Sequence, residues 1–266
     1  MPQPLPNQTI NQPKLTIITV VFNSVSFIER TIQNVLSQDY PAIEYIVIDG
    51  GSTDGTLDII KKYNHKISCW ISEPDKGLYD AMNKGMARAT GDFLWFINSG
   101  DLLYASDTVS HIFAGHKPEH KVYYGETVII DNDENEIGGR RLQCPAQLTW
   151  KSFAHGMLVS HQSIVVNRNI APLYDLQYRY AADFDWVIKV LRKAAPDVRL
   201  SDKAIVNTNL VLSKFLDGGQ TKRTIVRGLR ERFKIMARNY GFVPTLTRHF
   251  IIGVKFLFFV VRHGRF

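Results

Sequence analysis

The feature that most constrains the fold is an apolar run at residues 45–48 that stops abruptly at the polar segment 49–55. The run is short, rich in β-branched residues and free of charge, which predicts a central β-strand. In open α/β sheets, ligands bind outside the carboxyl ends of the strands. Asp49 stands at that point as a hydrogen-bond acceptor, and the two glycines after it allow the backbone to approach a ligand closely. The alternative interpretation is an Asp-Gly turn that begins the next helix, with Ser52 or Asp54 as the N-cap.

The same pattern occurs twice more in the first hundred residues. Residues 15–22 form an apolar run that ends at Asn23, and residues 93–97 form another that ends at Asn98. Elsewhere we expect helices at 25–38, 56–63, 79–89 and 183–193, strands at 67–72 and 157–166, and a β-hairpin at 122–141. Strands that alternate with helices in this way predict an α/β sheet with one functional edge.

Composition is that of an ordinary globular protein, but the charge is concentrated at one end. The 266 residues suffice for one main domain and an appendage, and two cysteines with no framework or metal-ligand spacing indicate a reducing compartment. Residues 1–14 are polar and lack the features of a signal peptide, so we expect a disordered tail. Residues 218–266 hold eleven Lys or Arg and one acid, Glu231, and carry +10, which leaves −3 for the rest of a chain of net charge +7. The basic character therefore belongs to the C-terminal segment.

Six short motifs follow one another along the chain. They are 19–23 (TVVFN), 49–56 (DGGSTDGT), 73–85 (EPDKGLYDAMNKG), 98–101 (NSGD), 161–162 (HQ) and 182–185 (ADFD). With these motifs, the stretch 15–194 resembles the inverting glycosyltransferases of family 2, and 73–85 is especially similar to bacterial enzymes that assemble exopolysaccharide, O-antigen and colanic-acid repeat units. The resemblance implies an α/β GT-A fold, a Rossmann-like and mostly parallel central sheet flanked by helices, with an added β-hairpin. We expect this catalytic domain at 15–215 and a C-terminal basic helical appendage at 216–266.

The resemblance implies a nucleoside diphosphate sugar as the donor. It assigns Asp49 to a hydrogen bond with an N–H of the base. Asp75, at the end of its strand, can lie beside the nucleoside too. Lys76 either faces the phosphates or is solvated. The residues that we expect to bind the nucleotide-sugar are Thr19, Val21, Asn23, Asp49, Gly50, Ser52, Asp75, Lys76, Gly77, Asp80, Asn83, Asn98, Ser99 and Gly100.

Asp101 is the predicted metal ligand. It corresponds to the last acid of the family's Asp-x-Asp motif, which binds a divalent cation that bridges the diphosphate. Ser99 and Gly100 stand where many relatives carry an acid. One carboxylate can suffice, because Mg²⁺ and Mn²⁺ take oxygen ligands and leave much of their coordination to phosphate and water. The alternative role for Asp101 is that of a turn residue.

Asp183 is the predicted general base, which must lie within hydrogen-bond reach of the attacking sugar hydroxyl. It matches the Asp of the family's acidic motif, in which Ala182 replaces the Glu. Asp183 as a simple N-cap, and Asp185 as the base, are the alternatives. His161 and Gln162 are expected on the acceptor or diphosphate side, with packing in the core as the alternative for His161. We expect the aromatic residues Tyr79, Trp95 and Trp186 to lie in the core.

The C-terminal segment predicts contact with a membrane surface. Residues 250–261 are apolar apart from Lys255 and lie between basic residues. Twelve residues are too few to span a bilayer, which takes about 20. An apolar block within basic flanks is typical of a helix that lies on an anionic membrane. Packing on the catalytic domain, or on a second subunit in a homodimer, is the alternative. Binding to nucleic acid would leave the aromatic run unexplained.

Together these features predict an enzyme that moves a sugar from a nucleotide donor to a lipid-linked or oligosaccharide acceptor, in the cytoplasm and peripherally on the inner face of the cell membrane. A dinucleotide-dependent oxidoreductase is excluded because residues 20–26 contain no glycine, whereas that class needs Gly-x-Gly-x-x-Gly after the first strand. A non-catalytic nucleotide-sugar or glycan-binding module remains the alternative. The retention of both Asp101 and Asp183 argues against it.

Overall fold

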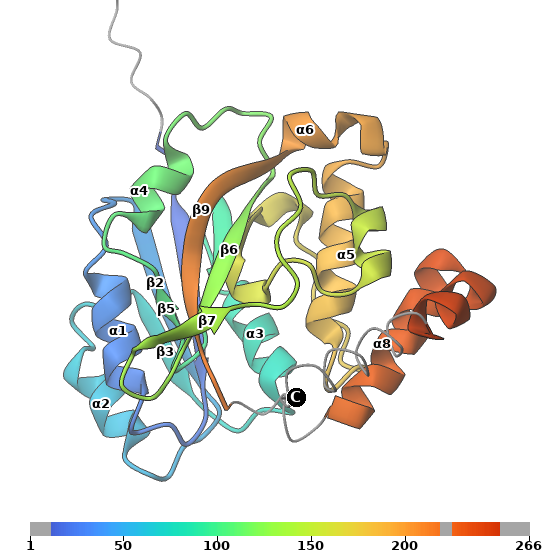
Figure 1. Cartoon of the computed structure of the whole chain (residues 1–266). Coiled ribbons are helices and arrows are strands. Elements are labelled where there is room, and N and C mark those ends of the chain that lie inside the picture. Colours follow the sequence, from blue (N-terminus) through green and yellow to red (C-terminus); the bar gives the residue numbers. More distant parts are fainter. Residues whose placement is uncertain (1–11, 219–224, 251–266) are drawn as a thin grey trace, which may run out of the picture.

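One mixed β-sheet organises the part of the chain that the computed structural model describes, residues 12–218 and 225–250 (Figure 1). Its strands lie in the order β3-β2-β1-β4-β8-β6-β9-β5, and β7 pairs with β6. Strands β1 (Leu15–Val21), β2 (Ile43–Asp49), β3 (Cys69–Ser72) and β4 (Phe93–Phe96) form the first half. Their pairings are all parallel. The polar ends of these strands therefore meet at one edge, as the sequence predicts.

The second half of the sheet is mixed, where the sequence predicts mostly parallel strands. It contains β5 (Leu102–Leu103), β6 (Val122–Ile130), β7 (Glu136–Gly139), β8 (Ile164–Asn167) and β9 (Ile205–Leu216). β8 is antiparallel to both β4 and β6, β9 is parallel to β6, and β5 is antiparallel to β9. The expected hairpin is confirmed as β6 and β7. The strand expected at 157–166 begins only at Ile164, because His161–Ser163 form a 3₁₀ turn.

Helices cover both faces of the sheet. Helices α1 (Ile28–Leu36), α2 (Thr56–Lys62) and α4 (Thr108–Phe113) pack on one face, and α3 (Leu78–Met86) and α5 (Ala182–Ala194) pack on the other. The alternation of β1 shows why both faces are apolar: Ile17 belongs to the core under α1, and Ile18 to the core under α3. The remaining short helices are α6 (Ser201–Ala204) and the 3₁₀ turns Trp150–His155, Arg168–Ile170 and Val198–Leu200.

The C-terminal helix α8 (Ile225–Tyr240) lies beside α5 (Figure 1). Its residues Ile235 and Met236 are buried in the same core as Phe184 and Trp186 of α5. Gly241, with a φ of 91°, ends α8, and residues 242–250 form a further helix. The expected basic helix at the start of the appendage is thus present and docked on the catalytic domain. Of the apolar block predicted to bind membrane, all but Phe250 lies outside the described residues, and within those residues no helix is long and apolar enough to cross a bilayer.

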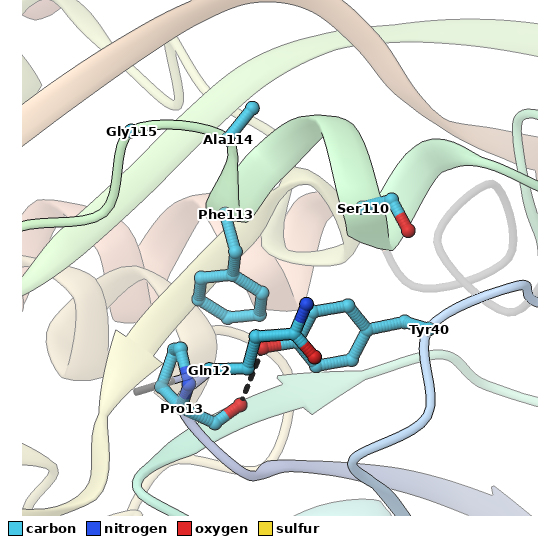
Figure 2. A pocket seen from close by; sticks show the side chains of 7 residues that line it. All are labelled: Gln12, Pro13, Tyr40, Ser110, Phe113, Ala114 and Gly115. Atoms are coloured by element: carbon cyan, nitrogen blue, oxygen red, sulfur yellow. Dashed lines mark hydrogen bonds between the residues drawn. The ribbon is translucent and has the colours of Figure 1, made fainter. Parts of the chain in front are cut away.

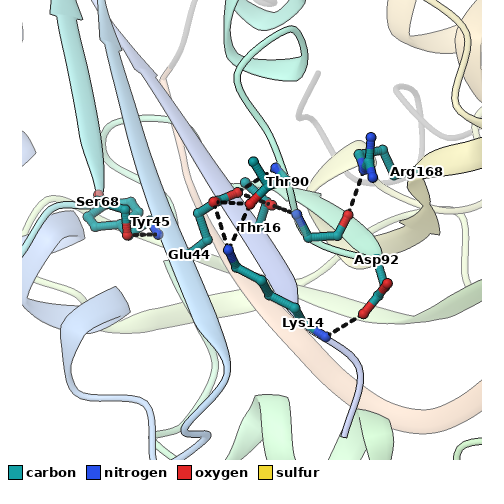
Figure 3. A network of polar contacts seen from close by, with 9 residues as sticks. Lys14, Thr16, Glu44, Tyr45, Ser68, Thr90, Asp92 and Arg168 are labelled. Atoms are coloured by element: carbon teal, nitrogen blue, oxygen red, sulfur yellow. Dashed lines mark hydrogen bonds and ion pairs between the residues drawn. The ribbon is translucent and has the colours of Figure 1, made fainter. Parts of the chain in front are cut away.

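A hydrogen-bonded cluster around Glu44 joins the amino ends of the strands (Figure 3). The Glu44 carboxylate accepts hydrogen bonds from Lys14 Nζ at 2.9 Å, from Thr16 Oγ1 at 2.6 Å, and from both the N–H and the hydroxyl of Thr90, at 2.7 and 2.5 Å. Burial alone raises the pKa of Glu44, but these donors outweigh it and lower the pKa to about 2. Glu44 is therefore a structural carboxylate with a full set of partners.

A shallow pocket opens at the same amino edge (Figure 2). In it Tyr40 donates a hydrogen bond to the carbonyl of Pro13 at 2.8 Å. The side chains that line it are Gln12, Pro13, Tyr40, Ser110, Phe113, Ala114 and Gly115. None of them is charged, and the pocket lies at the opposite end of the strands from the polar motifs. It is not suited to a diphosphate ligand.

Candidate active site

The loops after β1, β2 and β4 are joined by hydrogen bonds between their polar residues. The Asn23 N–H donates to Ser52 Oγ at 2.8 Å, and Asn23 Oδ1 accepts the Thr53 N–H at 2.9 Å. Ser24 and Ser99 share a hydrogen bond of 2.8 Å between their hydroxyls. Residues predicted to bind one ligand from three separate motifs therefore lie together at the carboxyl edge of the sheet.

Asp49 organises the loop after β2. It is fully buried, and its carboxylate accepts hydrogen bonds from the hydroxyl of Ser52 at 2.5 Å, from the Ser52 N–H at 3.0 Å and from the hydroxyl of Ser72 at 2.6 Å. Direct recognition of a base by this carboxylate stays a prediction. Thr19 and Val21 are also buried within β1, where Thr19 Oγ1 accepts a hydrogen bond from Tyr45, so their side chains face the core and not the loop surface.

The loop after β3 lies directly against the loop after β2. A Cβ atom on Gly50 would come within 2.4 Å of Asp75 Oδ2, so a larger residue at this position would require the Asp75 side chain to shift. Asp75 Oδ1 accepts the N–H of Gly77 at 2.7 Å. Gly77 has a φ of 118°, in the region that favours glycine, and it begins α3. The neighbour of Gly50 in this structure is the partly buried Asp75, and the close approach of the Gly50 backbone to a ligand stays a prediction.

The side chains of the 73–85 motif divide into exposed and internally bonded groups. Lys76 is exposed, while its N–H donates to Asp80 Oδ2 at 2.9 Å. Asn83 bonds the backbone of Tyr174 in both directions, with its amide donating to the carbonyl at 3.0 Å and its Oδ1 accepting the N–H at 2.8 Å. In this structure Asp80 and Asn83 therefore hold the site together rather than face solvent.

Asp101 lies on the loop between β4 and β5, and Gln162 contacts it. Gln162 Nε2 donates to Asp101 Oδ2 at 2.9 Å, and the Leu216 N–H donates to Oδ1 at 3.1 Å. Asp101 is only 4% exposed, and burial raises its pKa to about 7 against the opposing effects of Gln162, Leu216 and the more distant charge of Arg30. Both hydrogen-bond donors to this carboxylate are neutral, and no cation among the described residues contacts it.

The backbone of this loop is also specialised. Gly100 has a φ of 99°, and its N–H donates to Thr31 Oγ1 at 3.0 Å. Asn98 Oδ1 is buried and has no hydrogen-bond partner among the described residues. The loop therefore contains two oxygen-bearing groups with incomplete partners among the described residues: the Asp101 carboxylate has no cation in contact, and the Asn98 amide oxygen has no hydrogen-bond donor.

His161 connects this loop to the α3 side of the sheet through Tyr174. His161 Nε2 and the Tyr174 hydroxyl share a hydrogen bond. Both side chains are buried, and burial lowers the pKa of His161 to about 4, so its imidazole is neutral at physiological pH. Tyr174 stacks on Tyr79 with 5.5 Å between ring centroids. Sequence reasoning missed Tyr174, because it lies in an irregular segment with no motif around it.

Asp183 lies at the far end of this chain of contacts. The Tyr79 hydroxyl donates to Asp183 Oδ1 at 3.1 Å, and the N–H of Phe184 donates to the same oxygen at 2.9 Å. The structure records no hydrogen bond from the described residues to Asp183 Oδ2. One oxygen of this half-buried carboxylate is held in place, and the other remains available.

Asp185, the alternative base, has a different environment. It is 1% exposed, and its oxygens contact Arg238 Nη2 at 2.7 Å and Lys189 Nζ at 2.6 Å. Its side chain belongs to the interface between α5 and α8. The aromatic residues Tyr79, Trp95 and Trp186 lie in the core, as predicted.

The part of the chain that forms this edge matches a known protein family. The family model of Glycosyl transferase family 2 matches residues 16–170. The chain belongs to glycosyltransferase family 2. It is a glycosyltransferase, a transferase of class EC 2.4, and its fold is the GT-A fold.

Proteins that are similar in sequence agree with this family. An uncharacterized glycosyltransferase of Mycobacterium tuberculosis is 32% identical over 193 residues, covering 69% of this chain and 71% of the relative. A PGL/p-HBAD biosynthesis glycosyltransferase of Mycobacterium bovis is 29% identical over 206 residues, covering 74% and 77%.

The solved structures are more distant and show the fold alone. TarS 1-349 of S. aureus in complex with UDP has a TM-score of 0.62 at 16% identity, and the match covers 84% of this chain and 64% of that one. The mannosyltransferase PcManGT of Pyrobaculum calidifontis, in complex with GDP-Man and Mn²⁺, has a TM-score of 0.57 at 15% identity, covering 97% and 77%.

Proposed function

We propose that this protein transfers a sugar, with inversion, from a nucleoside diphosphate sugar to a hydroxyl group of a lipid-linked or oligosaccharide acceptor in the assembly of a surface polysaccharide. The observation that carries the proposal is the line of contacts from Asp101 through Gln162, His161, Tyr174 and Tyr79 to Asp183. It joins the predicted metal ligand to the predicted base. Solved neighbours that bind UDP or GDP-Man support a nucleotide-sugar donor.

Asp183 is the proposed general base. Its Oδ1 is fixed by Tyr79 and by the N–H of Phe184, so Oδ2 can accept the proton of the attacking hydroxyl. Asp185 is less suited to this role, because it is 1% exposed and its two oxygens already contact Lys189 and Arg238.

The loop around Asp101 fits a divalent cation such as Mg²⁺ or Mn²⁺. The Asp101 carboxylate is buried without a contacting cation among the described residues, and the Asn98 amide oxygen has no partner there. Within residues 12–218 and 225–250 no cluster of three or more His, Cys, Asp or Glu side chains is arranged to hold a metal. The diphosphate and water would therefore supply most of the ligands, as is usual for Mg²⁺. When bound, the cation would neutralise charge on the departing diphosphate. Gln162 orients the Asp101 carboxylate.

The decisive experiment is a screen of donors. Purified protein would be incubated with Mn²⁺ and UDP-, GDP- and dTDP-sugars, and release of the nucleoside diphosphate would be followed with and without glycan or lipid-linked acceptors. We expect turnover of donors that share one base, and a β-linked product from an α-linked donor. Binding of a donor without any turnover would instead support a non-catalytic binding module.

Residues 227–250 support the proposed attachment to the cytoplasmic face of the membrane. Phe242, Val243, Leu246 and Phe250 are 53% to 74% exposed on the last described helix. The basic residues of this region that the structure leaves exposed or half-exposed include Arg227, Arg230 and Arg248. Exposed apolar side chains near basic ones are typical of helices that bind anionic lipid surfaces.

Deletion of residues 245–266 tests this attachment. The shortened protein should no longer sediment with anionic liposomes at low salt, and it should keep hydrolysis of a soluble donor while transfer to a membrane-embedded acceptor falls further. The variant Leu246→Ser/Phe250→Ser is the matched control for folding, because both side chains are already exposed. If both the shortened protein and the double variant still bind liposomes, the membrane contact lies outside residues 245–266.

A further inference from the structure

Helix α5, which carries Asp183, begins without a capping side chain of its own. Its N-cap residue is Ala181, and no side chain at that position bonds the helix. The first N–H groups of an α-helix have no acceptor within the helix. Asp183 accepts one of them, the N–H of Phe184. The N–H groups that lead into the helix need an acceptor from elsewhere in the fold.

Glu231 of α8 is that acceptor. One of its oxygens accepts the N–H of Arg179 at 3.0 Å, and the other accepts the N–H groups of Tyr180 and Ala181 at 2.8 and 2.9 Å. A carboxylate at a helix N-terminus also interacts favourably with the helix dipole. Glu231 is the sole acid in residues 218–266. The single negative charge of the basic segment thus lies at the start of the helix that carries the proposed base.

The rest of α8 is fixed to α5, so Glu231 is held at a defined position. Ile235 and Met236 are 0% and 2% exposed. Arg238 reaches Asp185 at 2.7 Å. Because these contacts follow Glu231 along one helix, the carboxylate cannot move independently of α5. The backbone N–H groups of the turn at 179–181 are therefore hydrogen-bonded to a side chain of α8.

We propose that Glu231 is a positioning residue, which fixes the turn before α5 and thereby the direction in which Asp183 presents its free oxygen. The inference rests on the proposed function, because it takes Asp183 as the general base. It gives the C-terminal helix a role in the chemical step in addition to membrane contact. Misplacement of a reacting group by about 1 Å can cost on the order of 10²-fold in rate.

The test compares Glu231→Ala and Glu231→Gln with Lys234→Ala, an exposed position on the same helix, in the full-length protein with a soluble acceptor. Glu231→Ala should lower kcat for transfer roughly 10- to 100-fold while the donor KM changes less than about two-fold. Hydrogen exchange at the amides of residues 179–181 should accelerate. Glu231→Gln, whose amide oxygen still accepts hydrogen bonds, should restore part of kcat, and Lys234→Ala should match the wild type.

A double-mutant cycle separates positioning from general stability. On the Asp183→Asn background, Glu231→Ala should cause little further loss, because both changes act through the same base. If exchange accelerates but kcat is unchanged, or if the two losses multiply, Glu231 stabilises the fold without positioning the base. If Glu231→Ala does not fold, the same comparisons are made with Glu231→Gln. A wild-type protein that turns over no donor would refute the proposed function itself, which is a different result.

Discussion

Two buried carboxylates at opposite ends of the sheet show how differently one fold treats a negative charge. Glu44, at the amino end of β2, accepts four hydrogen bonds, one of them from the ammonium group of Lys14, and its pKa falls to about 2. Asp101, on the loop after β4, accepts two, both from neutral donors, and its pKa rises to about 7. The first charge is compensated by the protein. The second is left for a ligand, which is where a functional site is expected.

The same contrast occurs on α5. Asp185 contacts two cations, whereas Asp183 has one oxygen held by neutral donors and one without a recorded partner among the described residues. Compensated carboxylates therefore belong to the framework and incompletely compensated ones to the proposed site.

The largest expected effect is at Asp101. Asp101→Asn should abolish transfer at saturating Mn²⁺ while the protein stays folded. Burial raises the pKa of Asp101 from 3.8 to about 7, so the native state keeps this proton at pH values where the unfolded state has lost it, and native stability falls as the pH rises from about 4 to about 7. The stability of the variant relative to the wild type should therefore increase over this range and level off above about pH 7. Thermal unfolding at several pH values measures this. If the variant keeps most of the wild-type turnover, or if its stability relative to the wild type does not change with pH, then Asp101 does not differ from Glu44 in the way described above.

The next effect is at Asp183. Asp183→Asn should lower turnover by about 10²- to 10⁴-fold with donor binding nearly unchanged, because a positioned base contributes that much. Steady-state kinetics and donor titration measure the two quantities. Asp185→Asn is the matched variant on the same helix and should instead mainly lower the melting temperature. An inactive Asp185→Asn beside an active Asp183→Asn would show that the compensated carboxylate is the base.

The smallest effect on activity is at Glu44. Glu44→Gln should reduce the free energy of unfolding by roughly 2 kcal/mol, the order expected for hydrogen bonds to a charged group, and leave kcat and KM unchanged. The pKa of Glu44 is below its usual 4.5 in the native state, so the difference should be complete above pH 4.5 and shrink as pH falls toward 2. Chemical denaturation at pH 7 and pH 3 measures it. A loss of activity without loss of stability would give the amino edge a catalytic role.

The sequence predicts the parallel half of the fold well because apolar strands and polar strand ends are local signals. The mixed half depends on pairings between distant strands, such as β9 with β6, which no local pattern encodes. The contact of Gln162 with Asp101 joins residues 61 positions apart, so each motif was visible alone but their meeting was not. Glu231 stands out in the sequence only as the one acid of residues 218–266, and its hydrogen bonds to the backbone of residues 179–181 are visible only in the fold.

Burial explains why some predicted site residues have other local roles. Thr19 and Val21 lie in the last three residues of β1, a strand that is covered on both faces, so their side chains are in the core. The polarity of Asp49 and Asn83 suggested ligand contacts, but their groups bond the loops that surround them. Sequence patterns report which atoms are polar, and only the fold determines which polar atoms remain without a protein partner.

The position of β9 has a consequence for how the protein matures during synthesis. β9 inserts between β6 and β5, and its last residue, Leu216, bonds Asp101 across 115 positions of the chain. A nascent chain can form the first parallel strands early, but the Asp101 loop acquires this partner only after residue 216 has left the ribosome. Contacts of such long sequence separation form slowly. Donor binding should therefore appear late in folding, after most of the sheet is already in place.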